Sequence, residues 1–261
     1  MTRVGVFGAA GRMGATVCGA VAADPDLQLV AAVDPLHAGI DLRRVADVDS
    51  DLQVDAHAEA LLQSGAEVVV DFTHLDAARE NLTFAAEHGI HAVVGTTGFT
   101  DDDLVRLRAT FERSNCLIAP NFAIGAVLMM RFAELAAPWF ETAEVIELHH
   151  NQKLDAPSGT AMLTVERMAA ASDTWAEDPT RTEVIPGARG AKGPGGIPVH
   201  TVRLQGLVAH QEVLLGTTGQ SLSIRHDSYD RSSFMPGVLL GVKQVAKRPG
   251  LTVGLDALLF P

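Results

Sequence analysis

Short apolar runs alternate with longer segments of helical periodicity through the first half of the chain. The apolar runs predict strands at residues 4–8, 27–34, 67–73, 91–97 and 116–121. The segments between them predict helices at residues 11–25, 75–89 and 101–114. Because these strands are apolar on both faces, the pattern indicates a parallel sheet with helices on both sides.

After residue 121 the spacing of the apolar positions changes. Helices are predicted at residues 122–140 and 158–171, and strands at 144–150, 200–206, 209–216 and 220–228. The three last strands follow one another closely and are joined by glycine-containing turns, which favours an antiparallel or mixed sheet. The glycine-rich stretch 187–196 is expected to be a loop, either a moving flap or a surface connection.

The C-terminal pattern, a helix at 234–248 and the tail 251–259, indicates a return to the first domain. We therefore expect an α/β fold with a Rossmann-type parallel sheet in residues 1–121 and 232–261, which would be a dinucleotide-binding domain. Residues 122–231 are expected to form a second α+β domain with a mixed or antiparallel sheet.

Composition restricts the classes of partner. The 261 residues carry a net charge of −12, which argues against nucleic acid or an acidic membrane surface as a partner. An anionic substrate would need a local cationic pocket. The two cysteines have no metal-ligand spacing and indicate buried thiols in a reducing compartment. Without a signal peptide or a long apolar span, we expect a cytoplasmic protein.

The segment GAAGRMG at residues 8–14 spaces Gly8, Gly11 and Gly14 at every third position, between a predicted strand and a predicted helix. Backbone N–H groups there can bind a pyrophosphate, although glycine-rich turns also serve tight packing. Asp34, twenty positions after Gly14, is placed to accept hydrogen bonds from ribose hydroxyls. Asp34 favours NADH, whereas Arg12 could accommodate the phosphate of NADPH or simply be solvated.

Two further segments, GTTG at 95–98 and APNF at 119–122, lie at the carboxyl ends of predicted strands, where open α/β sheets bind ligands. Each could equally be an ordinary turn. The residues predicted to bind the cofactor are Gly8, Ala9, Ala10, Gly11, Arg12, Met13, Asp34, Gly95, Thr96, Thr97, Ala119, Pro120, Asn121 and Phe122.

The segment ELHHNQKLDAPSGTA at 147–161 concentrates groups suited to proton transfer and anion binding. His149 and His150 would point to opposite faces of a strand unless it ends there. Lys153 would lie in the following turn, where Asp155 could pair with it. Adjacent histidines lack the usual ligand spacing, so no metal is expected.

The same segment predicts a helix start. Ser158 is a natural N-cap, and Gly159 and Thr160 would then present first-turn N–H groups to a carboxylate. A histidine, a lysine and a helix N-terminus together can bind an anion and deliver a proton.

This segment resembles the signature of the dihydrodipicolinate reductase family, also described as 4-hydroxy-tetrahydrodipicolinate reductases. The similarity covers nearly the whole chain and includes VGVFGAAGRMG, VVVDFTH, VVGTTGF, IAPNFAIGAV, IPVHTVRLQGLVAHQEVLLG and LSIRHDSYDRSSFMPGVLL. It implies reduction of a small cyclic dicarboxylate by NADH or NADPH, with loss of water, to tetrahydrodipicolinate in lysine and diaminopimelate biosynthesis. It also implies a homotetramer assembled through the sheet of the second domain.

By resemblance, His149 is the acid/base histidine, His150 contacts the substrate, and Lys153 is a candidate proton donor and substrate ligand. The turn Ser158, Gly159 and Thr160 would hold a substrate carboxylate. Gln152 departs from the family pattern, in which a third histidine is common, so an additional titrating group at that position is not expected.

Two alternatives follow from the same fold. A dinucleotide-sensing regulatory protein would need Gly8, Gly11 and Asp34 but would have no use for His149 and Lys153. A semialdehyde or 2-oxoacid dehydrogenase would need a nucleophilic cysteine beside the histidines, and neither Cys18 nor Cys116 is placed there. The intact histidine–lysine segment favours the reductase.

Overall fold

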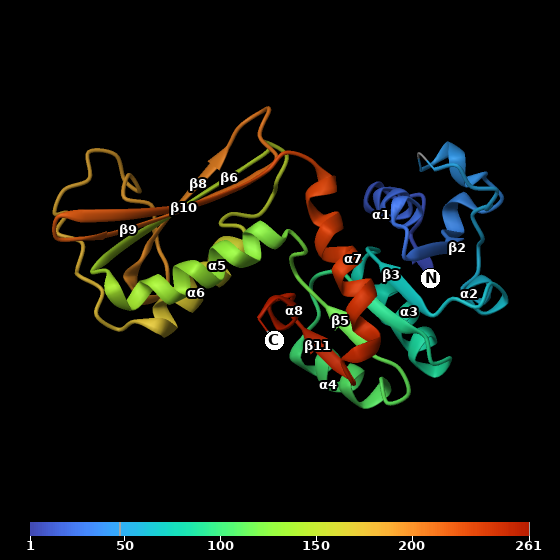
Figure 1. Ribbon diagram of the computed structural model, residues 1–261. Helices are drawn as coiled ribbons and strands as arrows, with labels where there is room; N and C mark the ends of the chain where they lie inside the picture. The colour runs from blue at the N-terminus through green and yellow to red at the C-terminus, as the bar shows by residue number, and fades with distance from the viewer. Residues whose placement is uncertain (47, 261) are drawn as a thin grey trace. The chain divides into compact units, whose positions relative to one another are not determined.

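The computed structural model describes residues 1–46 and 48–260 and divides into two compact units (Figure 1). The first unit comprises Met1–Phe122 and the C-terminal segment that begins at Phe234, and the second comprises Ala123–Ser233. The predicted limits, at 121 and 232, lie within two residues of these. The roles assigned to the two units remain a prediction.

Within the described residues, the first unit contains one six-stranded sheet with the order β11-β5-β4-β3-β1-β2. Each neighbouring pair is parallel, which confirms the predicted Rossmann-type sheet. The strands are β1 (Thr2–Phe7), β2 (Leu27–Val33), β3 (Val68–Asp71), β4 (His91–Val94), β5 (Cys116–Ile118) and β11 (Leu251–Val253). The last strand confirms that the tail returns to this unit.

Helices cover this sheet (Figure 1). They are α1 (Arg12–Ala23), α2 (Glu59–Gln63), α3 (Leu75–Glu87), α4 (Asp101–Thr110), α7 (Met235–Gln244) and α8 (Asp256–Leu259). The helix predicted over 101–114 ends earlier, at Thr110, and begins with a capping box in which Thr100 and Asp103 satisfy each other's backbone N–H groups. The α-helices predicted for 11–25, 75–89 and 234–248 also end two to four residues earlier.

The strands predicted at residues 67–73, 91–97 and 116–121 end two to three residues earlier in the structure. The chain leaves the sheet after Asp71, Val94 and Ile118, where strand pairing ends. At the first of these points, the carboxylate of Asp71 accepts the backbone N–H and the hydroxyl of Thr73, both at 2.7 Å. This side-chain capping turns the chain into a loop. The residues that follow the strands therefore form loops at the sheet edge where open α/β sheets bind ligands.

The second unit contains a mixed sheet, whose described strands follow the order β10-β9-β6-β8-β7. They are β6 (Thr142–His149), β7 (Ala191–Lys192), β8 (Pro198–Arg203), β9 (Ala209–Thr217) and β10 (Gln220–Ser228). Strands β6 and β8 are parallel, and the other pairs are antiparallel. This confirms the prediction of an antiparallel or mixed sheet. Helices α5 (Ile124–Ala136) and α6 (Gly159–Ala171) pack on each other and against this sheet (Figure 1).

The glycine-rich stretch 187–196 is not the plain loop that was expected. It contains β7, which pairs with β8, and a 3₁₀ turn at Pro194–Gly196. A Cβ atom on Gly190 would lie 2.7 Å from the carbonyl oxygen of Val199. Close packing of the backbone against β8 therefore explains a glycine here and gives the segment regular structure.

Candidate active site

The loop between β1 and α1 has the geometry of a phosphate-binding turn. Gly8 has a φ of +64°, and a Cβ atom on Gly14 would lie 2.0 Å from the carbonyl oxygen of Gly8. Gly11 is the N-cap of α1, and no side chain caps the helix or places a carboxylate in its first turn. The first turn therefore has neither a side-chain cap nor a carboxylate that would compete with an anionic group for its backbone N–H groups, so the loop fits a dinucleotide.

Asp34 connects the end of β2 to this loop. Its buried carboxylate accepts the backbone N–H of Ala10 at 3.3 Å and that of Leu36 at 3.1 Å. The Nδ1 atom of His37 lies 3.0 Å from the same carboxylate. The sequence analysis anticipated Asp34 as a ligand of ribose but did not anticipate His37 beside it.

The other predicted cofactor residues fall into two groups. The side chains of Ala9, Thr96, Ala119 and Phe122 are buried in the first unit, so only their backbones could contact a cofactor. The Thr96 hydroxyl, for example, donates to the carbonyl oxygen of Thr73 at 2.9 Å. Exposed or half-buried positions are Gly8, Ala10, Gly11, Arg12, Met13, Gly95, Thr97, Pro120 and Asn121.

In the second unit, the end of β6 forms a buried charged cluster. Glu147 and His149 lie on the same face of β6, because side chains on a strand alternate. The register with β8 places Thr201 opposite Glu147 and Arg203 opposite His149. The side chain of Glu147 is fully buried, whereas those of His149 and Arg203 are 16% and 19% exposed.

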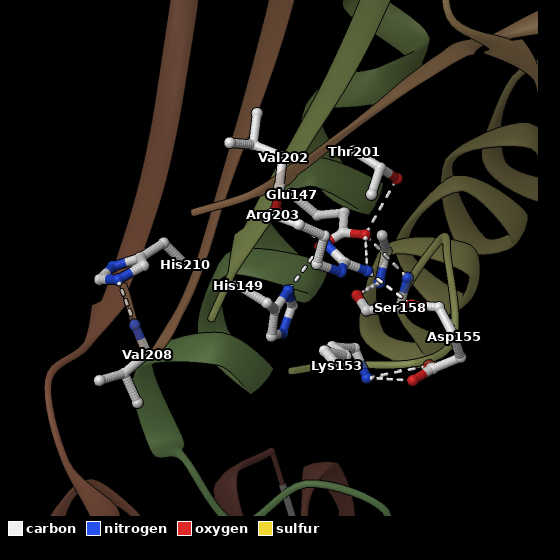
Figure 2. Close-up of polar contacts among 11 residues, drawn as sticks. Glu147, His149, Lys153, Asp155, Ser158, Thr201, Val202, Arg203, Val208 and His210 are labelled. Atoms are coloured by element: carbon white, nitrogen blue, oxygen red, sulfur yellow. Dashed lines mark hydrogen bonds and ion pairs between the residues drawn. The ribbon is translucent and has the colours of Figure 1, made fainter. Parts of the chain in front are cut away.

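The Glu147 carboxylate accepts hydrogen bonds at both oxygens (Figure 2). Oε1 accepts from the backbone N–H of Ser158 at 3.1 Å, the Thr201 hydroxyl at 3.0 Å and Nη2 of Arg203 at 2.9 Å. Oε2 accepts from Nη1 of Arg203 at 2.9 Å and is bonded to Nδ1 of His149. A buried carboxylate with this many donors is held in one orientation.

These contacts change the ionisation of both residues. Burial raises the pKa of Glu147, but the hydrogen bonds from Arg203, His149 and Thr201 outweigh burial and bring the pKa below its ordinary value. Burial lowers the pKa of His149, and the charges of Lys153 and Arg203 lower it further against the opposing effect of Glu147. Glu147 is therefore held ionised, and His149 is poised to release a proton.

Lys153 lies in the turn that follows β6. Its Nζ atom is 2.8 Å and 2.9 Å from the two carboxylate oxygens of Asp155, which confirms the pairing that the sequence left open. The hydrogen bond from Lys153 lowers the pKa of Asp155. Because the Asp155 side chain is 62% exposed, this ion pair is accessible to a competing anion.

The structure confirms Ser158 as the N-cap of α6, since its hydroxyl accepts from the backbone N–H of Ala161 at 3.2 Å. Its own N–H donates to Glu147, and the residue is buried. Ser158 thus positions the turn. Gly159 is exposed, and a Cβ atom built on it would have open space around it. The turn therefore leaves room for an anion beside Gly159 and Thr160.

His150 is exposed immediately after β6. Its backbone N–H donates to the carbonyl oxygen of Val208 at 3.3 Å, and its own carbonyl oxygen accepts from the N–H of Lys153 at 3.2 Å. The strand therefore ends between the two histidines. This arrangement places His149 in the cluster and His150 in the turn that carries Lys153.

Arg203 and Thr201 were not identified from the sequence, and Glu147 was quoted there without a role. Arg203 lies 56 positions from Glu147, so only the pairing of β6 with β8 brings them together. A local signal did exist for Glu147. It shares the buried face of β6 with Val145, and a glutamate at such a position needs partners.

The cysteines are unsuited to catalysis. Burial raises the pKa of Cys18 to about 12 and also raises that of Cys116. In the part of the chain that the structure describes, no group of three histidine, cysteine or acidic side chains is arranged to hold a metal ion. In the same part, no helix has the length and apolar character that crossing a membrane requires.

Comparisons with known proteins agree with this geometry. Two family models match, one described as "Dihydrodipicolinate reductase, N-terminus" over residues 2–122 and one described as "Dihydrodipicolinate reductase, C-terminus" over residues 125–259. The 4-hydroxy-tetrahydrodipicolinate reductases of Nocardia farcinica and Mycobacterium marinum are 55% and 52% identical to this chain, and 98% of each chain is covered.

A solved structure extends the similarity to three dimensions. The dipicolinate-bound dihydrodipicolinate reductase from Paenisporosarcina sp. TG-14 has a TM-score of 0.87 and 41% identity, over 98% of this chain and 99% of that one. These matches span both units and confirm the resemblance seen in the sequence. The chain belongs to the dihydrodipicolinate reductase family.

Proposed function

We propose that the protein reduces 4-hydroxy-tetrahydrodipicolinate to tetrahydrodipicolinate, with loss of water, as a step of lysine and diaminopimelate biosynthesis. The observation that carries this proposal is the site at the end of β6. His149, Lys153 and the N-terminus of α6 lie there together around a buried carboxylate (Figure 2). A dinucleotide sensor would have no need for such a cluster. Family membership supplies the substrate class.

His149 and Lys153 are the proposed catalytic residues. Addition of a hydride places negative charge on the conjugated ring of the substrate, and a nearby acid stabilises and protonates it. The lowered pKa of His149 makes its protonated form a stronger acid. Lys153 supplies a second positive charge, on the turn that begins at His150.

Binding of the dicarboxylate is assigned to the turns that flank the cluster. One carboxylate would replace Asp155 as the partner of Lys153, and the other would accept backbone N–H groups at Gly159 and Thr160. His150 is exposed beside Lys153 and can contact the substrate. Ser158 holds this turn in place, because its N–H donates to Glu147 and its hydroxyl accepts from the N–H of Ala161.

The cofactor is proposed to be NADH, NADPH or both. Residues Gly8 to Met13 would hold the pyrophosphate, and Asp34 would accept hydrogen bonds from the adenosine ribose. When the cofactor is bound, its reduced nicotinamide would supply the hydride. The carboxylate of Asp34 opposes a 2′-phosphate, whereas the exposed Arg12 favours one, so both cofactors are proposed as substrates.

We also propose a cytoplasmic homotetramer that assembles through the sheet of the second unit. The face of this sheet that carries Ile146, Leu148 and Val202 is opposite to the face of Glu147, and its apolar side chains are half-buried in the single chain. Association of such faces would remove apolar area from water. Light scattering on the purified protein tests the proposed mass of four chains.

The experiment that tests the proposed reaction is a steady-state assay. The product of a dihydrodipicolinate synthase reaction is added to the purified protein together with NADH or, in a second assay, NADPH. Oxidation of the cofactor is followed by the loss of absorbance of its reduced form. Oxidation that requires both the protein and the synthase product supports the reaction. Tight binding of NADH without oxidation would contradict it and favour the sensor. The ratio of the two kcat/KM values then measures cofactor preference.

A further inference from the structure

The further inference concerns the buried carboxylate beneath His149, and it rests on the proposed function. We propose that Glu147 is a positioning residue for the reaction. It holds the Nδ1–H of His149 and thereby makes Nε2 the nitrogen that delivers the proton to the substrate. Glu147 itself touches neither substrate nor cofactor in this proposal, because its side chain is fully buried.

The hydrogen-bonding capacity of each group fixes the direction of the bond. An ionised carboxylate can only accept, so the bond between Glu147 and His149 requires a proton on Nδ1. Glu147 is kept ionised by Arg203, which donates to both carboxylate oxygens. The neutral form of His149 therefore carries its proton on Nδ1 and a lone pair on Nε2.

The other ring nitrogen has the access that proton transfer needs. Nε2 makes no hydrogen bond to any of the described residues, and the His149 side chain is partly exposed. Once the hydroxyl group of the substrate has left as water, together with a proton from the adjacent ring carbon, the ring is conjugated. The imidazolium then donates its Nε2 proton to a ring carbon while the hydride adds at the neighbouring position. The substrate gains a hydride and a proton, His149 is left neutral with its proton on Nδ1, and water later restores the Nε2 proton.

The arrangement of donors predicts what Glu147→Gln will do. The Oε1 position has three donors, from Ser158, Thr201 and Arg203, so the amide oxygen of the new side chain will occupy it. The amide NH₂ group must then take the Oε2 position and face Nδ1 of His149 as well as Nη1 of Arg203. Because NH₂ donates, Nδ1 becomes the acceptor and the neutral ring moves its proton to Nε2. The substitution therefore reverses the tautomer.

A matched control lies on the same strand. Glu144 also binds one histidine and one arginine, His200 and Arg189, but it lies on the opposite face of β6. Glu144→Gln removes a carboxylate of the same kind without touching His149. The test compares the wild-type protein with Glu147→Gln and Glu144→Gln.

The first measurement is the ¹⁵N NMR spectrum of the histidine rings, with His149 assigned by its absence from His149→Gln. The expected result is a neutral ring protonated at Nδ1 in the wild type and in Glu144→Gln, and at Nε2 in Glu147→Gln. A wild-type ring protonated at Nε2 would overturn the inference. This spectrum needs no substrate, so it stands even if the proposed reaction fails in the wild-type assay.

The second measurement is steady-state kinetics. Glu147→Gln is expected to lower kcat by about 10²-fold, the loss typical of a misplaced general acid, while the KM for NADH stays within about twofold. Glu144→Gln is expected to keep the wild-type kcat. Wild-type turnover together with an unchanged kcat in Glu147→Gln would overturn the inference and leave the proposed reaction intact.

A further variant guards against loss of folding. Glu147→Gln leaves Arg203 without its carboxylate, whereas Glu147→Gln with Arg203→Met removes both charges at similar volume. If the single variant does not fold, the double variant is assayed in its place, with Arg203→Met as its reference. The expected kcat of the double variant is well below that of Arg203→Met. Equal kcat values would show that Glu147 acts only through stability and would overturn the inference.

Discussion

Two clusters of the same composition lie on opposite faces of β6. Glu147 binds His149 and Arg203, and Glu144 binds His200 and Arg189. The Glu147 side chain is fully buried, whereas the side chains of Glu144, His200 and Arg189 are 28%, 28% and 37% exposed. In each case the arginine comes from far along the chain, and so does His200, whereas His149 is two positions from Glu147.

The difference in environment decides what each cluster can do. In the single chain, solvent reaches the charges around Glu144, so its ion pairs contribute little there beyond fixing the segment that carries Arg189. Around Glu147 water is excluded, and the same charges shift the pKa values of Glu147 and His149. We therefore expect the proposed catalytic role to depend on the burial of the cluster and not on the residue types alone.

The largest expected effect is on kcat, and it distinguishes His149 from His200. His149→Gln should lower kcat by about 10³-fold, because it removes the proposed general acid. Lys153→Ala should lower turnover severely as well. In the other cluster, His200→Gln should leave kcat within about twofold of the wild type. Steady-state assays of the three variants at saturating NADH test this contrast.

Cofactor binding provides the control for that experiment. Titration with NADH, followed by fluorescence, should give near-normal affinity in His149→Gln and Lys153→Ala, since the residues proposed to bind the cofactor lie in the first unit. An equal loss of NADH affinity in both variants would contradict the assignment of substrate chemistry to one unit and nucleotide binding to the other.

The next effect is on stability. Glu147→Gln should lower the free energy of unfolding by about 3 kcal/mol, because it leaves Arg203 as a poorly solvated charge. Glu144→Gln should lower the free energy of unfolding by less than about 1 kcal/mol, because its ion pairs are partly exposed in the single chain. Urea unfolding followed by circular dichroism measures both, with light scattering to verify that the variants have the same mass. An equal loss of free energy of unfolding in the two variants would contradict the comparison between the clusters.

The fold could be predicted from the sequence because its signals are local. Apolar runs such as residues 67–73 and 91–97 identified strands that the structure contains, and the closer spacing after residue 200 identified the mixed sheet. Strand ends were misplaced because side-chain capping, as by Asp71, stops a strand without a change in apolar character. Segment 187–196 was misjudged because β7 depends on its partner β8.

The site was only partly predictable for a similar reason. His149, Lys153 and the N-cap Ser158 lie within one short segment, so their proximity is visible in the sequence. The partnership of Glu147 with Arg203 depends on strand register, which no local pattern specifies. The sequence thus indicated the groups that we propose to react, and the structure was needed to find the group that we propose to orient His149.

The smallest effect is the pH dependence of the stability that Glu147 provides. Its folded-state pKa lies below the ordinary value of 4.5, so its contribution is fully present above that value. As the pH falls from 4.5 through the folded-state pKa, the unfolded chain takes up a proton first and the contribution is lost. Removal of the carboxylate should therefore lower the free energy of unfolding most at neutral pH.

Titration of His149 must be removed to see this effect alone. We compare His149→Gln, whose amide NH₂ group can donate to Glu147 in place of Nδ1–H, with the double variant His149→Gln/Glu147→Gln. No imidazole at position 149 then contributes, and the donors Arg203 and Thr201 still lower the pKa of Glu147. The difference in the free energy of unfolding should be constant from pH 7 to about pH 5 and should narrow at lower pH. If the difference in the free energy of unfolding stays constant down to about pH 3, Glu147 is not held ionised by its donors. The burial of its cluster would then not distinguish it from the cluster around Glu144.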